Sequence, residues 1–497
     1  MNLLKKIDGS IFRLSCAALL TLSVAACAPD KQITETPLVP VKPKNVILFI
    51  GDGMGISTVT AIRIYEGQLR GQSGEENILS WEAFPRVALS KTYNTNQQVP
   101  DSAGTATAMY TGIKTKAGVL GVGPDVIRAD CASTPGTELP TILELAEEKG
   151  LSTGIVTTAR LTHATPGAAY AHISERDWEA DSDLSDEARQ NGCKDIARQF
   201  VDFNKGNGIE VALGGGRRNF IPATMPDPEY GDQSGERHDG RDLTREWQAK
   251  HPEGAYVWNA EQFAAIDPVK TDRLLGLFEP AHMQYDYDRR QDGSREPSLA
   301  EMTEKAVKML SKNDKGFFLM VEAGRIDHGH HEGRAAMALT DGVALHEAVK
   351  MADSLTDDGD TLIIVTADHS HTFVMAGYPT RGNPILGKVI GNDDHGNPAK
   401  SYSLMEDGKP YTTLGYQNGP GGIWPTDDHH YDRKDLTQVD TTDPEFHQQA
   451  LLPRKSETHG GEDVAIYAKG AGSELIGGVM EQNLIFDALK QVLPSEQ

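Results

Sequence analysis

The chain has 497 residues, of which 38% are hydrophobic, and a formal net charge of −24 at pH 7. A chain of this length and composition can bury a large core, which excludes an intrinsically disordered protein. The acidic balance disfavours a nucleic-acid-binding surface. A protein of this charge that handled an anionic substrate would need a local reversal of charge, and bound metal ions are the obvious source of one.

The first 26 residues predict an export signal. Three basic residues precede an apolar run at residues 16–26, which is too short to span a bilayer as a mature helix. Val24-Ala25-Ala26-Cys27 resembles the bacterial lipobox, in which the cysteine is lipidated and becomes the mature N-terminus, so residues 27–44 would form a tether. Cleavage of an ordinary signal peptide near Ala28 is the alternative. We therefore expect the protein in a bacterial cell envelope, anchored by lipid at Cys27 and facing the periplasm or the exterior.

Two cysteines, Cys131 and Cys193, remain inside the folded body once Cys16 is removed with the signal and Cys27 is lipidated. Only one pairing is then available, and an exported chain meets an oxidising compartment. Closing a loop of that size would stabilise the fold by ~4 kcal/mol in the chain-entropy model. Two unrelated buried thiols are the alternative.

Five short apolar runs have strand character and alternate with helical patterns, which indicates an α/β sheet. The runs lie at residues 46–50, 153–158, 209–213, 317–321 and 361–366. Apolar side chains at helical spacing predict two helices that face the core. The first set is Leu299, Met302, Ala306 and Met309, and the second is Leu484, Ile485, Ala488, Leu489 and Val492. Residues 373–457 have few long apolar runs and several Gly-Pro turns, and they predict an insertion.

Polar side chains follow several of these strands at the point where each strand ends. Asp52, Glu322 and Asp368 each come within about two residues of the end of a predicted strand, and a fourth strand leads to His163 and Thr165. Open α/β sheets place their binding sites at the carboxyl ends of their strands. We therefore expect these side chains to meet in one crevice.

Further metal-ligand types lie close to these positions. Asp327 and His331 are four residues apart, so they would share one face of a helix and could reach one zinc ion. Asp368 and His369 offer an oxygen and a nitrogen ligand just past a strand, and His459 is a candidate distant ligand. Each of these features alone is more typical of a surface loop or a structural histidine. Together they favour a metal site.

Ser102 and Arg176 are the candidate reactive residues. Ser102 lies among small residues beside an expected helix start, where a serine commonly serves only as an N-cap. In the functional interpretation a metal ion lowers the pKa of its hydroxyl, and the amides of the helix N-terminus face a phosphate. Arg176 could hold two phosphate oxygens with its planar guanidinium, although alone it would be taken for a surface arginine.

These segments resemble the alkaline phosphatase family. The matching motifs are Gly51-Asp-Gly-Met-Gly, Asp101-Ser-Ala-Gly-Thr-Ala-Thr, Val321-Glu, Arg325-Ile-Asp-His-Gly-His-His-Glu, Thr366-Ala-Asp-His-Ser-His and Glu457-Thr-His-Gly-Gly-Glu-Asp, and they run in order from about residue 45 to about residue 470. The chain is most similar to the animal tissue-type branch, because His163 and His328 stand where many bacterial members have aspartate and lysine.

The resemblance implies the fold and the partners. We expect an α/β sandwich over residues 45–497, with a central, mostly parallel sheet flanked by helices. Residues 373–457 would form a crown-like insertion. A homodimer and a disulfide between Cys131 and Cys193 are also implied.

The resemblance also implies three metal ions and their ligands. Asp327, His331 and His459 would hold the first zinc; Asp52, Asp368 and His369 the second; and Asp52, Thr165 and Glu322 a magnesium. His163 and His328 would lie just behind these ligands. A calcium ion would bind Glu229, Glu279, the carbonyl of Phe278 and, less securely because of a two-residue length difference, Glu296. The oxygen-rich third site independently favours a hard ion, as the histidine and carboxylate ligands favour zinc.

The implied reaction is the hydrolysis of phosphate monoesters through a phosphoserine at Ser102. Three divalent ions outweigh the four carboxylates, so with Arg176 and an ionised Ser102 the site keeps about two positive charges, which match a phosphate-monoester dianion. Phosphodiesterases, sulfatases and a catalytically inactive lipoprotein are the competing interpretations. The residues after Ser102 lack the sulfatase pattern, diesterases generally lack the third metal, and intact Ser102 and Arg176 argue against inactivity.

Overall fold

The computed structural model describes residues 43–293, 295–423 and 433–494. All the described residues belong to one compact unit. The predicted signal, Cys27 and nearly all of the predicted tether lie outside the described residues. Across the described ranges, no helix is long and apolar enough to cross a membrane.

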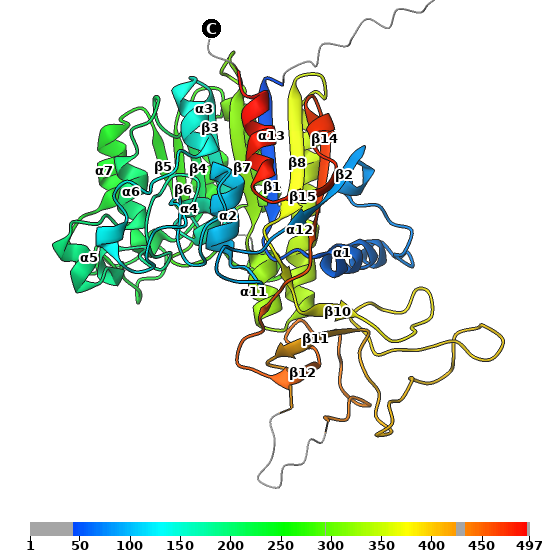
Figure 1. Cartoon of the computed structure of the whole chain (residues 1–497). Helices are drawn as coiled ribbons and strands as arrows, with labels where there is room; N and C mark the ends of the chain where they lie inside the picture. Colours follow the sequence, from blue (N-terminus) through cyan, green and yellow to red (C-terminus); the bar gives the residue numbers. More distant parts are fainter. Residues whose placement is uncertain (1–42, 294, 424–432, 495–497) are drawn as a thin grey trace, which may run out of the picture. The chain divides into compact units, whose positions relative to one another are not determined.

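A ten-stranded sheet forms the centre of this unit (Figure 1). In spatial order its strands are β15 (Gly478–Glu481), β2 (Arg86–Lys91), β14 (Val464–Gly470), β8 (Thr361–Ala367), β1 (Asn45–Gly51), β7 (Phe317–Ala323), β3 (Ser152–Arg160), β4 (Val211–Gly215), β6 (Leu274–Leu277) and β5 (Ala255–Val257). Only β14 runs antiparallel to its neighbours. The predicted α/β architecture with a mostly parallel sheet is confirmed.

The central strand β1 packs a core on each of its faces. Its side chains alternate, with Leu48 and Ile50 in one buried cluster and Ile47 and Phe49 in the other. A strand that is apolar on both faces must be covered on both sides, which is typical of parallel sheets. β1 lies between β7 and β8, so the three strands end side by side.

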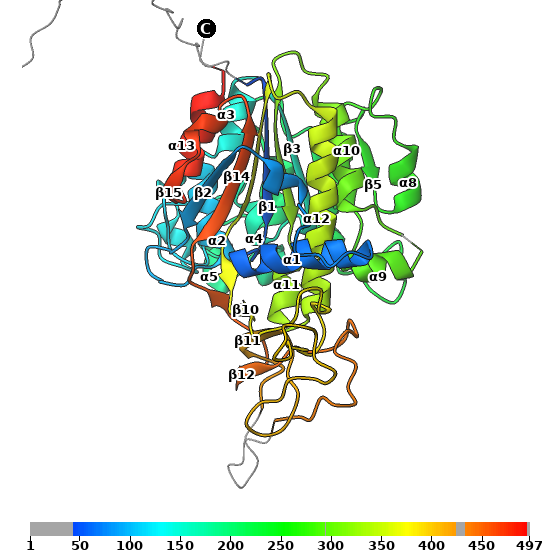
Figure 2. The same cartoon turned by 90° about the vertical axis from the view of Figure 1, so that its right-hand side faces the viewer.

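Helices cover both faces of the sheet, with α1, α10 and α12 on one side and α2, α3 and α13 on the other (Figure 2). The α-helices are α1 (Ile56–Leu69), α2 (Ser102–Thr111), α3 (Ile142–Glu148), α4 (Ala164–Gly167), α5 (Asp186–Gln190), α6 (Ile196–Asp202), α7 (Leu243–Lys250), α8 (Ala260–Ala265), α9 (Asp286–Gln291), α10 (Leu299–Leu310), α11 (Arg325–His331), α12 (Ala335–Leu355) and α13 (Leu484–Val492).

The predicted elements are present, with two corrections. The strand expected at residues 209–213 begins at Val211, because Ile209 and Glu210 precede the first ladder pair with β6. The apolar set of α10 is buried as predicted. In α13, however, Leu484 is 39% exposed. It occupies the first turn, where the buried face of the helix is carried by Ile485 instead.

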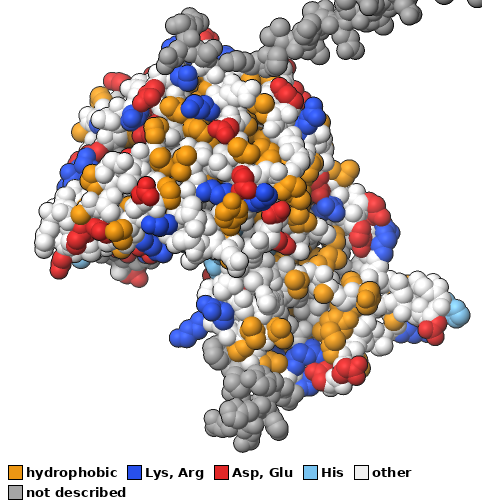
Figure 3. Space-filling view, in the orientation of Figure 1, with side chains coloured by type: hydrophobic (Ala, Val, Ile, Leu, Met, Phe, Trp, Pro, Cys, Tyr) orange, Lys and Arg blue, Asp and Glu red, His pale blue; other side chains and the backbone are white. Residues whose placement is uncertain are grey.

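The predicted insertion at residues 373–457 forms a separate three-stranded sheet with long loops. Its strands are β10 (Phe373–Met375), β11 (Leu414–Gly419) and β12 (Ala450–Pro453). Exposed apolar side chains gather on this part of the chain (Figure 3), among them Val374, Leu451 and Leu452. Elsewhere in the unit, Cys131 and Cys193 form the predicted disulfide, with Cα atoms 6.1 Å apart.

Candidate active site

The candidate ligands meet at the carboxyl ends of the central strands. Asp52 directly follows β1 and Asp368 directly follows β8, while Glu322 is the last residue but one of β7. Because these strands are neighbours, their ends bring three carboxylates together. A short two-stranded sheet of β9 (Ser370–His371) and β13 (His459–Gly460) adds His459 from a distant part of the chain.

The first predicted zinc set forms a closed group. The Asp327 Oδ1 atom lies 3.3 Å from His331 Nε2 and 3.4 Å from His459 Nε2, and the two histidine nitrogens are 3.1 Å apart. Ligand atoms on a tetrahedral zinc with bonds of about 2.0 Å are about 3.3 Å apart. As predicted, α11 places Asp327 and His331 on one helix face. The three residues therefore have the spacing that a zinc ion needs.

The second set has the same spacing and includes the candidate nucleophile. The Nε2 atom of His369 lies 3.3 Å from both Asp52 Oδ1 and Asp368 Oδ2. Ser102 Oγ is 3.1 Å from this nitrogen and 3.5 Å from Asp52 Oδ1. The serine oxygen thus lies beside one carboxylate and the imidazole of this set, where one metal ion could contact all three.

Backbone carbonyls fix the orientation of all three candidate zinc-ligand imidazoles. The Nδ1 atoms of His331, His459 and His369 contact the carbonyls of Glu457, Pro100 and Ser370 at 2.7, 2.8 and 3.3 Å. A carbonyl can only accept, so each Nδ1 carries the proton and each Nε2 keeps its lone pair for a metal.

The third predicted set is marked by buried polar atoms without hydrogen-bond partners. Asp52 Oδ2, Thr165 Oγ1, Glu322 Oε1 and His163 Nδ1 are all in this condition. Asp52, His163 and Glu322 each offer an atom within 4.8 Å of the others. Buried polar groups left unpaired are costly, so the donor set fits an ion. His163 lies beside these atoms, but its Nε2 accepts from Arg176, so the neutral ring carries its proton on Nδ1 and is not itself a ligand.

The raised pKa values of the carboxyl groups at this site also indicate that it is built to hold cations. Burial and the neighbouring carboxylates Asp368 and Asp327 hold the pKa of Asp52 well above its usual value. Burial raises the pKa of Glu322 to about 7, with Asp368 contributing. Carboxyls gathered out of water resist ionisation, and divalent cations remove that resistance.

Asp101 organises the other two candidate catalytic residues. It is the N-cap of α2, since its Oδ1 accepts a hydrogen bond from the Gly104 N–H at 3.0 Å. Ser102 is therefore not the cap, and its side chain is free to face the metal ligands. The other oxygen of Asp101 accepts from Arg176 Nη1 at 3.2 Å. Although burial opposes it, Arg176 and backbone amides lower the pKa of Asp101. The guanidinium of Arg176 is thus held in place by the ionised carboxylate of Asp101.

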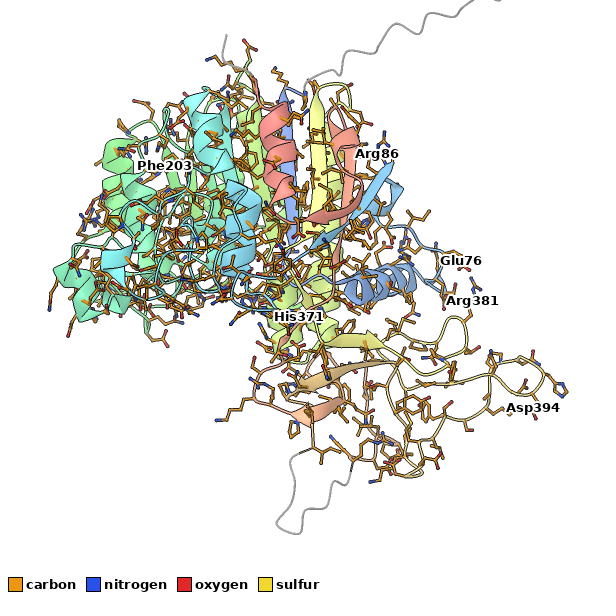
Figure 4. All side chains as sticks on the ribbon, in the orientation of Figure 1. Glu76, Arg86, Phe203, His371, Arg381 and Asp394 are labelled. Carbon is orange, nitrogen blue, oxygen red and sulfur yellow. A yellow bond between two sulfur atoms is a disulfide. The ribbon has the colours of Figure 1, made fainter. Side chains whose placement is uncertain are left out.

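Two histidines at the site were not predicted as functional. His371 lies between Asp327 and Glu457, at 2.8 and 2.6 Å, at the junction of the main sheet and the insertion (Figure 4). Although burial lowers it, these carboxylates raise the pKa of His371 to about 10. Gly53 has a φ of 69°, and a Cβ there would lie 2.3 Å from His371 Nε2. In the sequence, the pair of histidines two residues apart just after Asp368, His369 and His371, is the feature that could have identified His371 as a site residue.

The second unpredicted histidine is His282, in the loop after β6. Its ring lies 5.2 Å from that of His163 and 4.1 Å from that of His328, centroid to centroid. No local pattern in the sequence distinguishes it, because His163 lies between β3 and α4 and His328 lies on α11.

The predicted calcium ligands are Glu229, Phe278, Glu279 and Glu296. In the described part of the chain, the groups that could hold an ion do not include these carboxylates. Glu229 pairs with Arg217 at 3.3 Å, and Glu279 accepts from the Tyr230 hydroxyl at 2.8 Å. Glu296 Oε2 is buried without a partner. The calcium site stays a prediction.

Comparison with known proteins agrees with this geometry. The alkaline phosphatase family model matches residues 43–494. The alkaline phosphatase of Gadus morhua is 48% identical over 465 residues, covering 93% of this chain and 94% of that protein. The tissue-nonspecific isozyme of Homo sapiens is 47% identical over 453 residues, covering 89% and 82%.

Solved structures share the fold. The alkaline phosphatase of Thermus thermophilus has a TM-score of 0.63 at 26% identity and covers 91% of this chain and 92% of its own. That of the Antarctic bacterium TAB5 has a TM-score of 0.61 at 24% identity, with 92% and 100% covered. The resemblance to the animal tissue-type branch is confirmed by the curated relatives. The chain belongs to the alkaline phosphatase family and is a phosphoric monoester hydrolase with metal cofactors.

Proposed function

We propose that the protein hydrolyses phosphate monoesters through a covalent phosphoserine at Ser102, with two zinc ions and one magnesium ion. The observation that carries this proposal is the contact of Ser102 Oγ with His369 Nε2 and Asp52 Oδ1, at 3.1 and 3.5 Å. A hydroxyl in contact with two candidate zinc ligands is a nucleophile whose pKa a metal ion could lower without a histidine base.

The donor sets differ in chemistry, which supports different ions. The first zinc would be held by Asp327, His331 and His459, and the second by Asp52, Asp368 and His369. The magnesium would be held by Asp52, Thr165 and Glu322, with His163 beside them. When bound, these ions supply Lewis acidity at the nucleophile and the leaving oxygen, and positive charge for the substrate dianion.

The chain's own residues would carry out the remaining work. Arg176 holds two nonbridging oxygens of the substrate phosphate with its planar fork, while Asp101 keeps the guanidinium in place. Ser102 Oγ loses its proton and attacks phosphorus as the ester P–O bond breaks, and the departing alkoxide takes up a proton. Water then cleaves the phosphoserine, which returns Ser102 and releases phosphate.

An assay of a monoester beside a diester tests this assignment. We expect p-nitrophenyl phosphate to be hydrolysed with a kcat/KM at least about a hundredfold above that of bis-p-nitrophenyl phosphate, because the metal-loaded site would match the two negative charges of a monoester and a diester carries only one. Trapping of one phosphate per chain on Ser102 at acidic pH, seen by mass spectrometry, would support the covalent step. A preference for the diester would contradict the proposal.

His163 and His328 should set metal and product affinity. Burial and nearby arginines hold the pKa of both imidazoles well below the ordinary value, so both are neutral at alkaline pH. We expect His328→Lys to strengthen phosphate inhibition by about tenfold and to slow turnover, because a charged group near the product delays its release. We expect His163→Asp to bind Mg²⁺ more tightly, because a carboxylate adds charge beside the third ion.

Both variants are compared with wild type by phosphate inhibition constants and magnesium titration at alkaline pH. His346→Lys is a matched control, because His346 packs against Trp81 and contacts the Ser80 amide away from the site. Unchanged phosphate inhibition in His328→Lys would refute the product-release argument.

We also propose that the protein is exported to a bacterial cell envelope and attached to a membrane by lipid at Cys27. We expect Cys27→Ser to release the protein from membranes with unchanged activity, because the catalytic ligands begin at Asp52, beyond the predicted tether. Two or more acyl chains give stable attachment where one is marginal. Fractionation and mass spectrometry of the mature N-terminus are the measurements. An unmodified N-terminus downstream of Cys27 would exclude the anchor.

A homodimer and a calcium ion complete the proposal. Exposed apolar side chains on the insertion, including Val374 and Leu451, offer surface for association. The calcium ion would bind Glu229, Glu279, the carbonyl of Phe278 and, less securely, Glu296, whose unpartnered buried oxygen supports its inclusion. Light scattering of the purified protein and calcium analysis after dialysis test the two points; a monomer without calcium would refute both.

A further inference from the structure

Three histidines form a cluster beside the phosphate site. His163, His282 and His328 each offer a ring nitrogen within 4.8 Å of the others. By residue type this cluster resembles a transition-metal site. Its surroundings determine whether a cation or an anion would bind there.

Each imidazole faces an arginine. Arg176 Nη2 lies 3.2 Å from His163 Nε2, and Arg325 Nη1 lies 3.0 Å from His328 Nδ1. Arg160 contacts both ring nitrogens of His282, one with its guanidinium and one with its backbone N–H, and the neutral ring accepts at one of the two. Arginine has donors only, so these contacts occupy ring lone pairs that a metal would need. Three guanidinium groups also repel a cation. The cluster is therefore unsuited to a metal ion.

The arginines differ in how their charge is balanced. Arg160 makes a two-pronged ion pair with Glu179, and Arg176 pairs with Asp101. Among the described residues, by contrast, no carboxylate lies within ion-pair distance of Arg325. Its guanidinium stacks on the Tyr285 ring, 3.7 Å from the centroid, and its Nε is buried without a hydrogen-bond partner. Arg325 therefore contributes one positive charge without a carboxylate partner and one buried N–H donor, on Nε, that makes no hydrogen bond.

His328 adds a second donor. Because its Nδ1 accepts from Arg325, the neutral ring carries its proton on Nε2. Arg325, His328, His282 and Arg160 are all only partly buried, so solutes from solvent can reach them. A half-buried surface with spare donors and an arginine that no carboxylate pairs with suits an anion.

We propose that Arg325 and His328 bind a second anionic group, a carboxylate or a phosphate, carried by the leaving group of the monoester substrate. The inference rests on the proposed phosphomonoesterase site, because Arg325 lies two residues before the metal ligand Asp327 on α11, and the cluster contacts Arg176. A chain with a formal charge of −24 would otherwise repel such a substrate. The subsite thus selects doubly anionic monoesters.

The test compares two substrates that differ mainly in this group, 2-phosphoglycolate and ethyl phosphate. The wild-type enzyme should have the higher kcat/KM for 2-phosphoglycolate, chiefly through KM. In Arg325→Gln the ratio of the two kcat/KM values should fall about tenfold, as expected for one lost hydrogen bond to a charged group. Arg325→Lys, which keeps the charge, should retain part of the preference.

Arg381→Gln is the matched control. Arg381 is an exposed arginine of the insertion that pairs with Glu76 (Figure 4), so its substitution removes one positive charge away from the site. It should leave the ratio unchanged. An equal loss on both substrates in Arg325→Gln, or equal wild-type values for both, would overturn the subsite while leaving the phosphatase proposal intact. Failure to hydrolyse either substrate would instead refute the proposed function. A zinc ion found on the three imidazoles by anomalous scattering would also overturn the inference.

Discussion

Ser102→Ala is expected to lower kcat for a phosphate monoester on the order of 10⁴-fold, because it removes the atom that attacks phosphorus. Residual activity would come from water acting in the same electrostatic site. The fold should persist, since among the described residues the hydroxyl makes hydrogen bonds to Asp52 and His369 alone, both candidate ligands. The helix cap of α2 is Asp101, which the substitution does not touch.

Steady-state turnover, zinc and magnesium content and the thermal midpoint are measured together. We expect the metal content to stay near the wild-type value and the midpoint to shift by only a few degrees. Ser90→Ala is the control, because Ser90 is a buried serine of β2 whose hydroxyl has no hydrogen-bond partner. Wild-type turnover in Ser102→Ala would show that another residue is the nucleophile.

Removal of the metal ions is expected to abolish activity and to destabilise the fold. Asp52, Glu322, Asp327 and Asp368 are buried together, and in the absence of cations their charges repel. Zinc plus magnesium should restore turnover better than either ion alone, because the donor sets differ in chemistry. The measurements are activity and thermal midpoint after chelation and after stepwise readdition. Full activity in a sample that elemental analysis finds free of metal would refute the two-zinc interpretation.

The metal-free protein should also show a distinctive dependence of stability on pH. Burial raises the pKa of Glu322 from 4.5 to about 7, so the folded state holds its proton more tightly than the unfolded chain does. This contribution to stability is complete below pH 4.5 and is lost as the pH rises through about 7. Burial raises the pKa values of Asp52 and Asp368 as well, which adds to the loss.

Asp327 does not oppose this loss of stability near pH 7. Against the effect of burial, His331 and His371 hold its pKa well below the ordinary value, so its contribution is lost only in acid. The buried histidines with lowered pKa values, among them His163, His328 and His369, oppose it only up to their unfolded pKa of about 6.5. The thermal midpoint of the metal-free protein should therefore fall as the pH rises from about 7 to about 8, while that of the metal-loaded protein should not. A midpoint that rises over this range without metal would contradict the clustering of the carboxylates.

Much of the fold and of the site followed from local sequence. The apolar runs of β1, β7 and β8 predicted buried parallel strands, because a strand covered on both faces is apolar throughout. The candidate ligands Asp52 and Asp368 come directly after such runs, and strand ends in one sheet meet at one edge. The spacing of Asp327 and His331 likewise needs only one turn of helix.

Three strands toward the two sides of the sheet, β2, β5 and β6, were not predicted, because their sequence patterns are weak. β5 has three residues and β6 has four, and β2 is exposed at three of its six positions. Short or half-exposed segments become strands only when a neighbour supplies hydrogen bonds. Their identity is therefore a property of the assembled sheet.

The sequence by itself determined the metal-ligand types, the α/β class and the membership in the family, because these depend on residues at fixed local spacing. Tertiary structure alone decided which atoms face one another. His371 joins Asp327 to Glu457, and His282 joins the cluster of His163 and His328, across segments far apart in the chain. The lack of a carboxylate partner for Arg325 is likewise a result of tertiary structure. The packing of α11 against the loop after β6 decides which groups contact this arginine, and its neighbours in the sequence do not.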